Sequence, residues 1–167
     1  MNIVLCGMMG AGKSTVGQKV AGLLKMRFAD TDTVITERYG VINEIFARYG
    51  EAHFRGLETE VTRELSEKDN LVISTGGGLV LKEENVALLK KEGKLFFLTA
   101  GADTLFMRVQ GDHTRPLLKT ANARERIEEL LALRTPRYES AADYTIDTDK
   151  KSADEVAREI VAIMERA

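Results

Sequence analysis

Eight residues near the start of the chain have the types and the spacing of a phosphate-binding loop. Gly7 is followed after four residues by Gly12, Lys13 and Ser14, directly after the apolar run Asn2–Cys6. Glycines let successive backbone N–H groups point at phosphate oxygens, and a helix beginning at Lys13 adds the positive end of its dipole. The pattern predicts binding of a nucleoside triphosphate, but it does not identify a second substrate.

The polar residues of this loop have separate expected tasks. Lys13 supplies a mobile positive charge for the outer phosphates, and the Ser14 hydroxyl can ligate a Mg²⁺ ion that bridges them. A glycine-rich turn capped by Ser14 would explain neither the lysine nor its spacing. The residues expected to contact the nucleotide here are Gly10, Ala11, Gly12, Lys13, Ser14 and Thr15.

The rest of the chain favours adenine over guanine. The strings Asp-x-x-Gly and Asn-Lys-x-Asp, which a GTP-binding switch would carry, do not occur. ATP is therefore the expected co-substrate, by exclusion. The apolar run at residues 71–74 continues into glycines and not into a metal-binding aspartate. The acidic partner of the metal must come from elsewhere, and Asp30 is the best candidate.

Asp30 and Asp32 stand two residues apart at the end of another apolar run. If the strand stays extended, both carboxylates face the same side. One can hold the metal while the other accepts a hydrogen bond from an attacking hydroxyl. The alternative is that Asp32 caps a helix starting at Thr33 and that Asp30 is a solvated strand end. Because the phosphate loop is expected nearby, a functional role is favoured for both aspartates. Asp32 could cap a helix and act in the site at the same time.

These motifs depend on strands and helices that alternate along the chain. Such alternation predicts an α/β fold, a three-layer sandwich whose parallel, five-stranded sheet carries helices on both faces. Ligands bind at the carboxyl ends of such strands, where the three unusual segments are expected to converge. The expected strands are residues 2–6, 27–30, 71–74, 94–99 and 144–146, and the expected helices are 13–25, 51–68, 83–91, 123–134 and 153–166.

Composition narrows the class of protein. The 167 residues suit a single domain over 1–167, and a formal net charge of −2 with interspersed signs argues against a nucleic-acid or anionic-membrane partner. No apolar run is long enough to span a membrane, and no signal peptide opens the chain, so a cytoplasmic location is expected. Cys6 is the single cysteine and is expected to be a buried strand residue, not a reactive thiol.

Taken together, the motifs resemble those of the shikimate kinase family, in order and spacing, over roughly residues 1–160. The resemblance implies a P-loop kinase fold with a mobile lid, and transfer of the ATP γ-phosphoryl group to the 3-hydroxyl of shikimate. One departure is Gly56, where many family members carry a second basic residue after the arginine. The matching segments are residues 7–15, 28–32, 50–55, 76–78, 115–118 and 134–138.

The resemblance also implies a role for individual residues. Ser14 and Asp30 would hold Mg²⁺, Lys151 would contact ATP, and Arg115 would close over the phosphates from a lid at about residues 111–122. Lys13, Asp32 and Arg115 would be the catalytic residues. The shikimate-binding residues would be Asp32, Arg55, Gly76, Gly77, Gly78 and Arg134.

The chemistry of these residues suits that substrate. A guanidinium group holds a carboxylate through two parallel hydrogen bonds, which Arg55 and Arg134 could supply. The alternative for such arginines is pairing with nearby acids such as Glu51 or Glu58. Three consecutive glycines let the backbone approach a ligand closely, although they could also form a simple flexible turn.

Two other functions stay open. A gluconate kinase or a nucleoside monophosphate kinase would share the fold but use another acceptor, and a monophosphate would call for phosphate-directed arginines and a base pocket. A nucleotide-binding regulatory protein without catalysis is the alternative from another class, and the intact Lys13, Ser14, Asp30, Asp32 and Arg115 argue against it. The protein is expected to act as a monomer.

Overall fold

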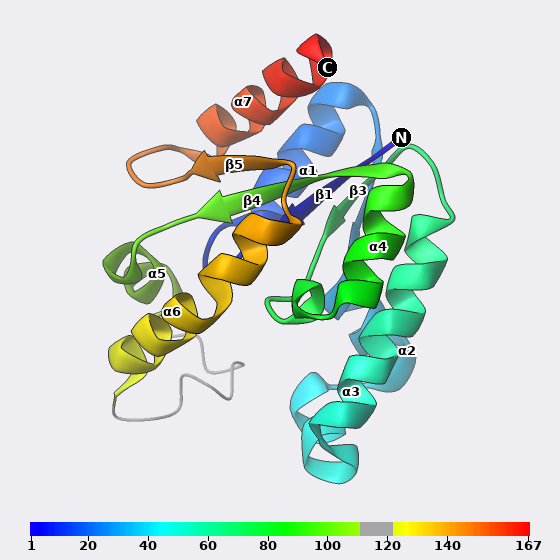
Figure 1. The fold of residues 1–167 in the computed structure, drawn as a ribbon, viewed down its shortest axis with the longest axis vertical. Helices are drawn as coiled ribbons and strands as arrows, with labels where there is room; N and C mark the ends of the chain where they lie inside the picture. The colour runs from blue at the N-terminus through cyan, green and yellow to red at the C-terminus, as the bar shows by residue number, and fades with distance from the viewer. Residues whose placement is uncertain (111–121) are drawn as a thin grey trace.

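A computed structural model describes residues 1–110 and 122–167, which fold around one parallel sheet of five strands (Figure 1). The spatial order is β2-β3-β1-β4-β5, so the chain starts near the centre and returns through crossovers. The predicted α/β class with a five-stranded parallel sheet is confirmed. The strands are β1 (Asn2–Cys6), β2 (Arg27–Asp30), β3 (Leu71–Ser74), β4 (Gly93–Thr99) and β5 (Tyr144–Asp147).

Helices cover both faces of the sheet (Figure 1). On one face α1 (Lys13–Leu24) packs against α7 (Ala153–Arg166). The other face carries α3 (Ile42–Ser66), α4 (Glu83–Lys91) and α6 (Ala123–Ala141). The remaining elements are α2 (Thr31–Tyr39), which packs on α3, the short 3₁₀ helix η1 (Leu79–Leu81), and α5 (Ala102–Val109), which packs on α6.

The central strands are apolar because both of their faces are covered. Every residue of β1 and of β3 is buried, whereas the edge strand β2 is partly exposed. A parallel sheet with helices on both sides requires such continuous apolar strands. Cys6 is fully buried at the end of β1, as expected, and burial raises the pKa of its thiol to about 12.

Four helices differ from expectation. The helix expected at 51–68 begins at Ile42 and is kinked at Gly50, where φ is 83° and ψ is 172°. The helix expected to end at Arg134 continues through Pro136 to Ala141. Packing explains the second difference, because Tyr138 and Ala141 are buried beyond the proline and compensate for its missing N–H. The helix α5 is not among the expected helices, and α2 is foreseen only in the alternative of a helix that starts at Thr33.

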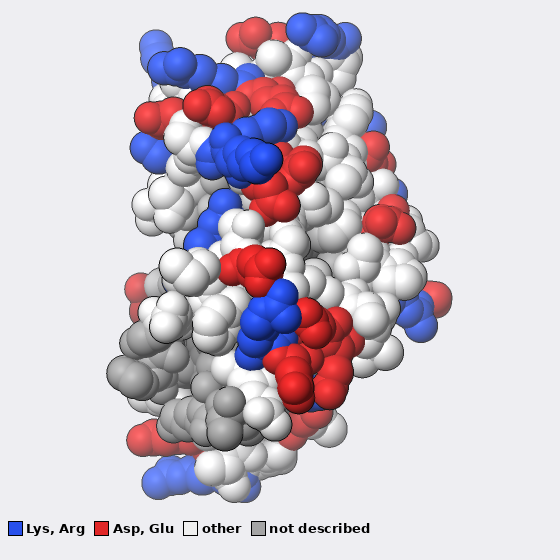
Figure 2. Space-filling model, turned by 90° about the vertical axis from the view of Figure 1, so that its left-hand side faces the viewer, with Lys and Arg blue, Asp and Glu red and all other residues white. Residues whose placement is uncertain are grey.

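Charge is mixed over the surface. Figure 2 shows Lys and Arg side chains among Asp and Glu side chains on the face that carries α5, α6 and β5. Arg124, for example, pairs with Asp103 at 2.5 Å and with Glu128 at 2.5 Å. Among the described residues, no helix has the length and apolar character needed to cross a bilayer.

Candidate active site

Three strand ends bring the predicted motifs to one edge of the sheet. In the strand register Ser74 lies beside Leu5 of β1 on one side and beside Asp30 of β2 on the other. The phosphate loop follows β1, the paired aspartates follow β2, and the three glycines follow β3. The expected convergence at the carboxyl ends of the strands is therefore present in the fold.

The phosphate loop leads directly into α1. Gly12 is the N-cap of this helix, with φ of 90° and no side-chain cap, so the first N–H groups of α1 stay available. The Lys13 Nζ donates to the carbonyl oxygens of Gly7 at 2.6 Å and of Met8 at 3.0 Å. The ammonium group thus folds over its own loop, where helix dipole and backbone N–H groups favour an anion.

Three oxygen-bearing side chains meet at the start of α1. The Ser14 hydroxyl donates to Asp30 Oδ2 and lies 3.3 Å from the Ser74 hydroxyl. Hard oxygen atoms of this kind are the ligands that Mg²⁺ prefers, and Mg²⁺ commonly takes few protein ligands beside substrate phosphates. The described residues contain no group of three or more His, Cys, Asp or Glu side chains that could hold a metal. The two hydroxyls and the Asp30 carboxylate fit Mg²⁺ that takes its remaining ligands from a bound phosphate.

Asp30 also caps α2. Its Oδ1 accepts the N–H groups of Asp32 at 2.9 Å and of Thr33 at 3.2 Å. The alternative in which Asp32 caps a helix from Thr33 was wrong, because α2 begins at Thr31 and its N-cap is Asp30. The strand also does not stay extended to Asp32, which lies in the first helical turn.

Asp32 lies against Gly76, the first of the three glycines, from the first turn of α2. A Cβ atom placed on Gly76 would lie 2.8 Å from Asp32 Oδ1. The backbone N–H of Gly76 donates to the Thr31 hydroxyl at 3.0 Å, which ties the glycine segment to α2. The geometry brings Asp32 and the glycines together, as the sequence predicts.

Arg55 lies across the glycine segment from α3. A Cβ atom on Gly78 would stand 2.5 Å from Arg55 Nη1, so no larger residue could let the guanidinium group lie so close. Arg55 also pairs with Glu58 at 2.6 Å and with Glu51 at 3.3 Å. The alternative of pairing with nearby acids is thus correct, and it coexists with the position of Arg55 beside Gly78.

Glu58 is the buried member of this group. Its side chain is 1% exposed, and burial raises its pKa to about 7 although Arg55 opposes the rise. Its Oε2 lies 3.0 Å from the same Cβ position on Gly76 that Asp32 approaches. Two carboxylates therefore face one point above the glycine segment.

Arg134 reaches the middle glycine from α6. Arg134 is 8% exposed, and a Cβ atom on Gly77 would lie 3.2 Å from Arg134 Nη1. One turn further along α6, the buried Tyr138 hydroxyl donates to the carbonyl oxygen of Gly77 at 2.6 Å. Burial raises the pKa of Tyr138 to about 12, so the phenol stays protonated as a donor.

A basic pocket of about 530 Å³ opens beside these residues. Arg55, Gly78 and Arg134 line it, and Lys82 and Arg126 add further positive charge. Such a lining suits a small anion whose carboxylate can be held by guanidinium groups. Glu51, Leu81, Asn85, Leu130 and Leu133 complete the lining.

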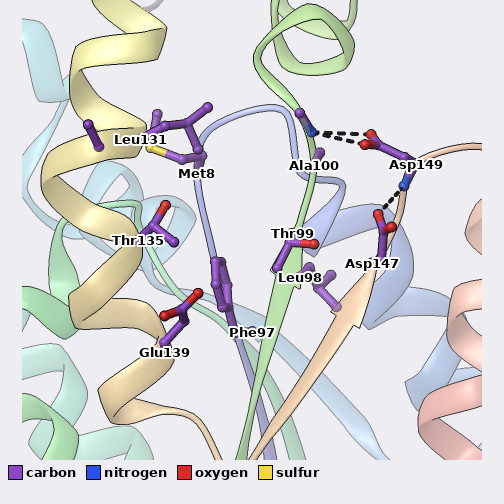
Figure 3. Close-up of a pocket in the computed structure, with 12 residues that line it drawn as sticks. Met8, Phe97, Leu98, Thr99, Ala100, Leu131, Thr135, Glu139, Asp147 and Asp149 are labelled. Carbon is purple, nitrogen blue, oxygen red and sulfur yellow. Dashed lines mark hydrogen bonds between the residues drawn. The ribbon is translucent and has the colours of Figure 1, made fainter.

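A second pocket, of about 520 Å³, lies between the ends of β4 and β5 and helix α6 (Figure 3). Met8 of the phosphate loop lies beside Leu131 on its upper side in this view, and Phe97 forms part of its apolar wall. The charged groups that line it are the carboxylates of Glu139, Asp147 and Asp149. None of the residues predicted for the site lines this pocket, and its acidic character does not suit a phosphate or a carboxylate.

The remaining predicted residues have different outcomes. Thr15 is exposed on α1. Lys151 pairs with Glu159 of α7 at 3.0 Å, so its predicted contact with ATP would require it to leave this partner. Arg115 and residues 111–121 of the predicted lid lie outside the described residues.

Sequence reasoning assigned no site role to three residues that the fold brings to these motifs. Glu58 and Tyr138 follow Arg55 and Arg134 by one helical turn, a spacing that could have indicated them. Arg108 of α5 donates to the Gly10 carbonyl oxygen at 3.1 Å and to the Thr148 hydroxyl at 3.2 Å. It links the phosphate loop to the loop after β5, and no local pattern marks that role.

Comparisons with known proteins find one family over nearly the whole chain. A model of the shikimate kinase family matches residues 9–165. A shikimate kinase from Thermodesulfovibrio yellowstonii is 46% identical over 166 residues, covering 99% of this chain and 95% of the relative. The solved shikimate kinase from Acinetobacter baumannii, in complex with shikimate, is 38% identical with a TM-score of 0.95, over 99% of this chain and 93% of that one. A gluconokinase from Sinorhizobium meliloti, at 19% identity and a TM-score of 0.68 over 99% and 91%, shares the fold.

Proposed function

The chain belongs to the shikimate kinase family, and we propose that its site transfers the γ-phosphoryl group of ATP to the 3-hydroxyl of shikimate, giving shikimate 3-phosphate. The protein is an ATP-dependent small-molecule kinase of the shikimate pathway. One observation carries the assignment of the acceptor. Arg55 and Arg134 lie against the glycine segment at the sheet edge that also bears the phosphate loop.

The phosphate loop and α1 bind the nucleotide. The backbone N–H groups of residues 10–15 and the Lys13 ammonium group surround the phosphates, and Lys13 exchanges its loop carbonyl partners for phosphate oxygens. Ser14 and Asp30 would hold Mg²⁺, which when bound offsets negative charge on the phosphates. Arg115 is proposed, from its motif alone, to add positive charge to the transferring group.

The other side of the site holds the acceptor. Arg55 and Arg134 are proposed to bind the carboxylate of shikimate, while the closely approached backbone of residues 76–78 leaves room for the ring. Asp32 orients the 3-hydroxyl and accepts its proton as the oxygen attacks phosphorus. Most of the rate enhancement then comes from positioning and charge stabilisation.

The decisive experiment measures ADP release by the purified protein with Mg–ATP and one acceptor at a time: shikimate, gluconate or AMP. Release with shikimate alone supports the proposal. Activity with gluconate or AMP instead would overturn the acceptor site but keep the kinase, and no release with any of the three would favour a regulatory nucleotide-binding protein.

Substitutions then test the acceptor site itself. Arg55→Ala should raise the KM for shikimate roughly 10- to 100-fold, since a charged hydrogen bond contributes about 1.5–3 kcal/mol. Asp32→Asn should lower kcat by about 10²-fold or more. Arg63→Ala is the matched control, because Arg63 lies on the same helix but pairs with the exposed Glu84. ATP binding should be retained in all three variants.

We also propose that the enzyme acts in the cytoplasm, where ATP is available, and as a monomer.

A further inference from the structure

Three buried polar side-chain atoms of the described residues have no hydrogen-bond partner, and all belong to the acceptor side of the site. They are Glu58 Oε2, Asn85 Oδ1 and Arg134 Nε. The other carboxylate oxygen of Glu58 accepts from Arg55 at 2.6 Å. The mechanism proposed above gives Glu58 Oε2 no role. A buried hydrogen-bond acceptor without a partner lowers the stability of the fold, so this atom needs an explanation.

The surroundings of Glu58 come from three helices and the glycine segment. Arg55 faces it from α3, Asp32 from α2 and Arg134 from α6. The exposed Glu51 does not face Glu58 itself but pairs with Arg55. The backbone of Gly76 completes the site, with both Asp32 Oδ1 and Glu58 Oε2 within 3.0 Å of its Cβ position. Two like charges therefore share a small space, and protonation of one of them relieves their repulsion.

The charges of this cluster balance only while the acceptor is absent. Within the cluster, with all groups ionised, the carboxylates of Asp32 and Glu58 offset the guanidinium groups of Arg55 and Arg134. Lys82 and Arg126 also line the pocket, but they are 45% and 44% exposed, so solvent screens their charge. A bound shikimate adds one carboxylate and removes water, which leaves one negative charge in excess. Uncompensated charge in a desolvated site is expensive, and a buried acid responds by binding a proton.

We propose that Glu58 takes up a proton from solvent when shikimate binds, an inference that rests on the function proposed above. The proton enters at Oε2, so that Oε1 keeps its bond from Arg55. The new O–H group faces the region of Asp32 Oδ1, which converts two repelling carboxylates into a donor and an acceptor. The cluster then remains neutral with the acceptor in place.

The direction of the pH dependence follows. Burial places the pKa of Glu58 near 7 in the free protein, and a bound anion raises it further. Below about pH 7 the proton is already present, so the affinity for shikimate is high and nearly constant there. Above about pH 7 binding must bring in a proton, and the affinity falls by up to about tenfold per pH unit.

Calorimetry measures this proton directly. Shikimate is titrated into the wild-type protein at pH 7.5 in phosphate, HEPES and Tris buffers, whose ionisation enthalpies differ. The slope of the observed enthalpy against the buffer ionisation enthalpy gives the protons taken up, and a positive slope between zero and one is expected. Glu58→Gln, which can still accept from Arg55 Nη1, should bind shikimate with a slope near zero.

Glu60→Gln is the matched control, because Glu60 lies on the same helix but is exposed and accepts from Tyr39, away from the pocket. It should keep the positive slope. A zero or negative slope in the wild type, or a positive slope retained in Glu58→Gln, would overturn the inference. Should Glu58→Gln fail to bind, the wild-type dissociation constant at pH 6.5, 7.5 and 8.5 decides: weakening supports proton uptake, and constant or tightening affinity contradicts it. Absence of any binding heat together with absence of ADP release would refute the proposed function itself.

Discussion

Asp30 combines two tasks that substitution can separate. One carboxylate oxygen caps α2 through the N–H groups of Asp32 and Thr33, and the other accepts from Ser14 at the proposed metal site. Asp30→Asn keeps an oxygen for the cap but loses the negative charge. Asp30→Ala loses both.

We expect the two Asp30 variants to differ in stability and to agree in activity. Asp30→Ala should lower the free energy of unfolding by about 1 kcal/mol, whereas Asp30→Asn should stay within about 0.5 kcal/mol of wild type. Both should need more Mg²⁺ for ADP release. Urea unfolding and a Mg²⁺ titration of the initial rate measure these quantities, and an unchanged Mg²⁺ requirement in Asp30→Asn would remove Asp30 from the metal site.

Glu58 makes stability depend on pH in a predictable direction. Its pKa is raised from an ordinary value of 4.5 to about 7 in the folded protein, first of all by burial. An acid with a raised pKa contributes its full stability below about pH 4.5, and loses it as the pH rises to about 7. The free energy of unfolding of wild type relative to Glu58→Gln should therefore fall from pH 5 through pH 7 and level off only above about pH 8. Urea titrations at these pH values test this, and a difference independent of pH would contradict it.

At the scale of elements, the kink in α3 depends on one glycine. Gly50 adopts φ of 83° and ψ of 172°, a region that is almost confined to glycine, yet a Cβ atom there would contact nothing within 4 Å. Gly50→Ala should lower the free energy of unfolding by about 1–3 kcal/mol through backbone strain alone.

Gly56 provides the opposite control on the same helix. A Cβ atom on it also meets nothing within 4 Å, but its backbone is helical. Gly56→Ala should stabilise the protein by about 0.5–1 kcal/mol. Denaturant unfolding of both variants measures the contrast. Equal effects of the two substitutions would show that the kink does not need glycine.

At the scale of the whole molecule, we expect a single unfolding transition, because the chain is expected to form one domain. Shikimate at 100 times its dissociation constant should add about 2.7 kcal/mol and raise the Tm by roughly 5–10 °C. Scanning calorimetry with gluconate as the control ligand tests this, and two separate transitions would contradict a single domain. Light scattering should give a mass near 18.5 kDa for a monomer.

Local residue patterns were enough to predict the sheet and most of the motifs. The bounds of β1, β2, β3, α4 and α7 agree with the structure, because buried parallel strands and amphipathic helices leave a periodic apolar signal. The helix α2 was foreseen only as an alternative from Thr33, because only Thr31 and Ile35 of its nine residues are buried. The phosphate loop was also evident from local sequence, because its glycines, lysine and serine all lie within residues 7–14.

Contacts between distant segments needed the tertiary structure. Sequence alone identified the shikimate kinase motifs, but the fold decided that Asp30 and not Asp32 caps α2, and that Arg108 reaches Gly10 across 98 residues of chain. It also placed Glu58 under Arg55 beside Asp32, where burial and a neighbouring carboxylate raise its pKa. Such properties depend on desolvation and on groups from several elements, which no local pattern encodes, whereas residue types and spacing are read directly from the chain.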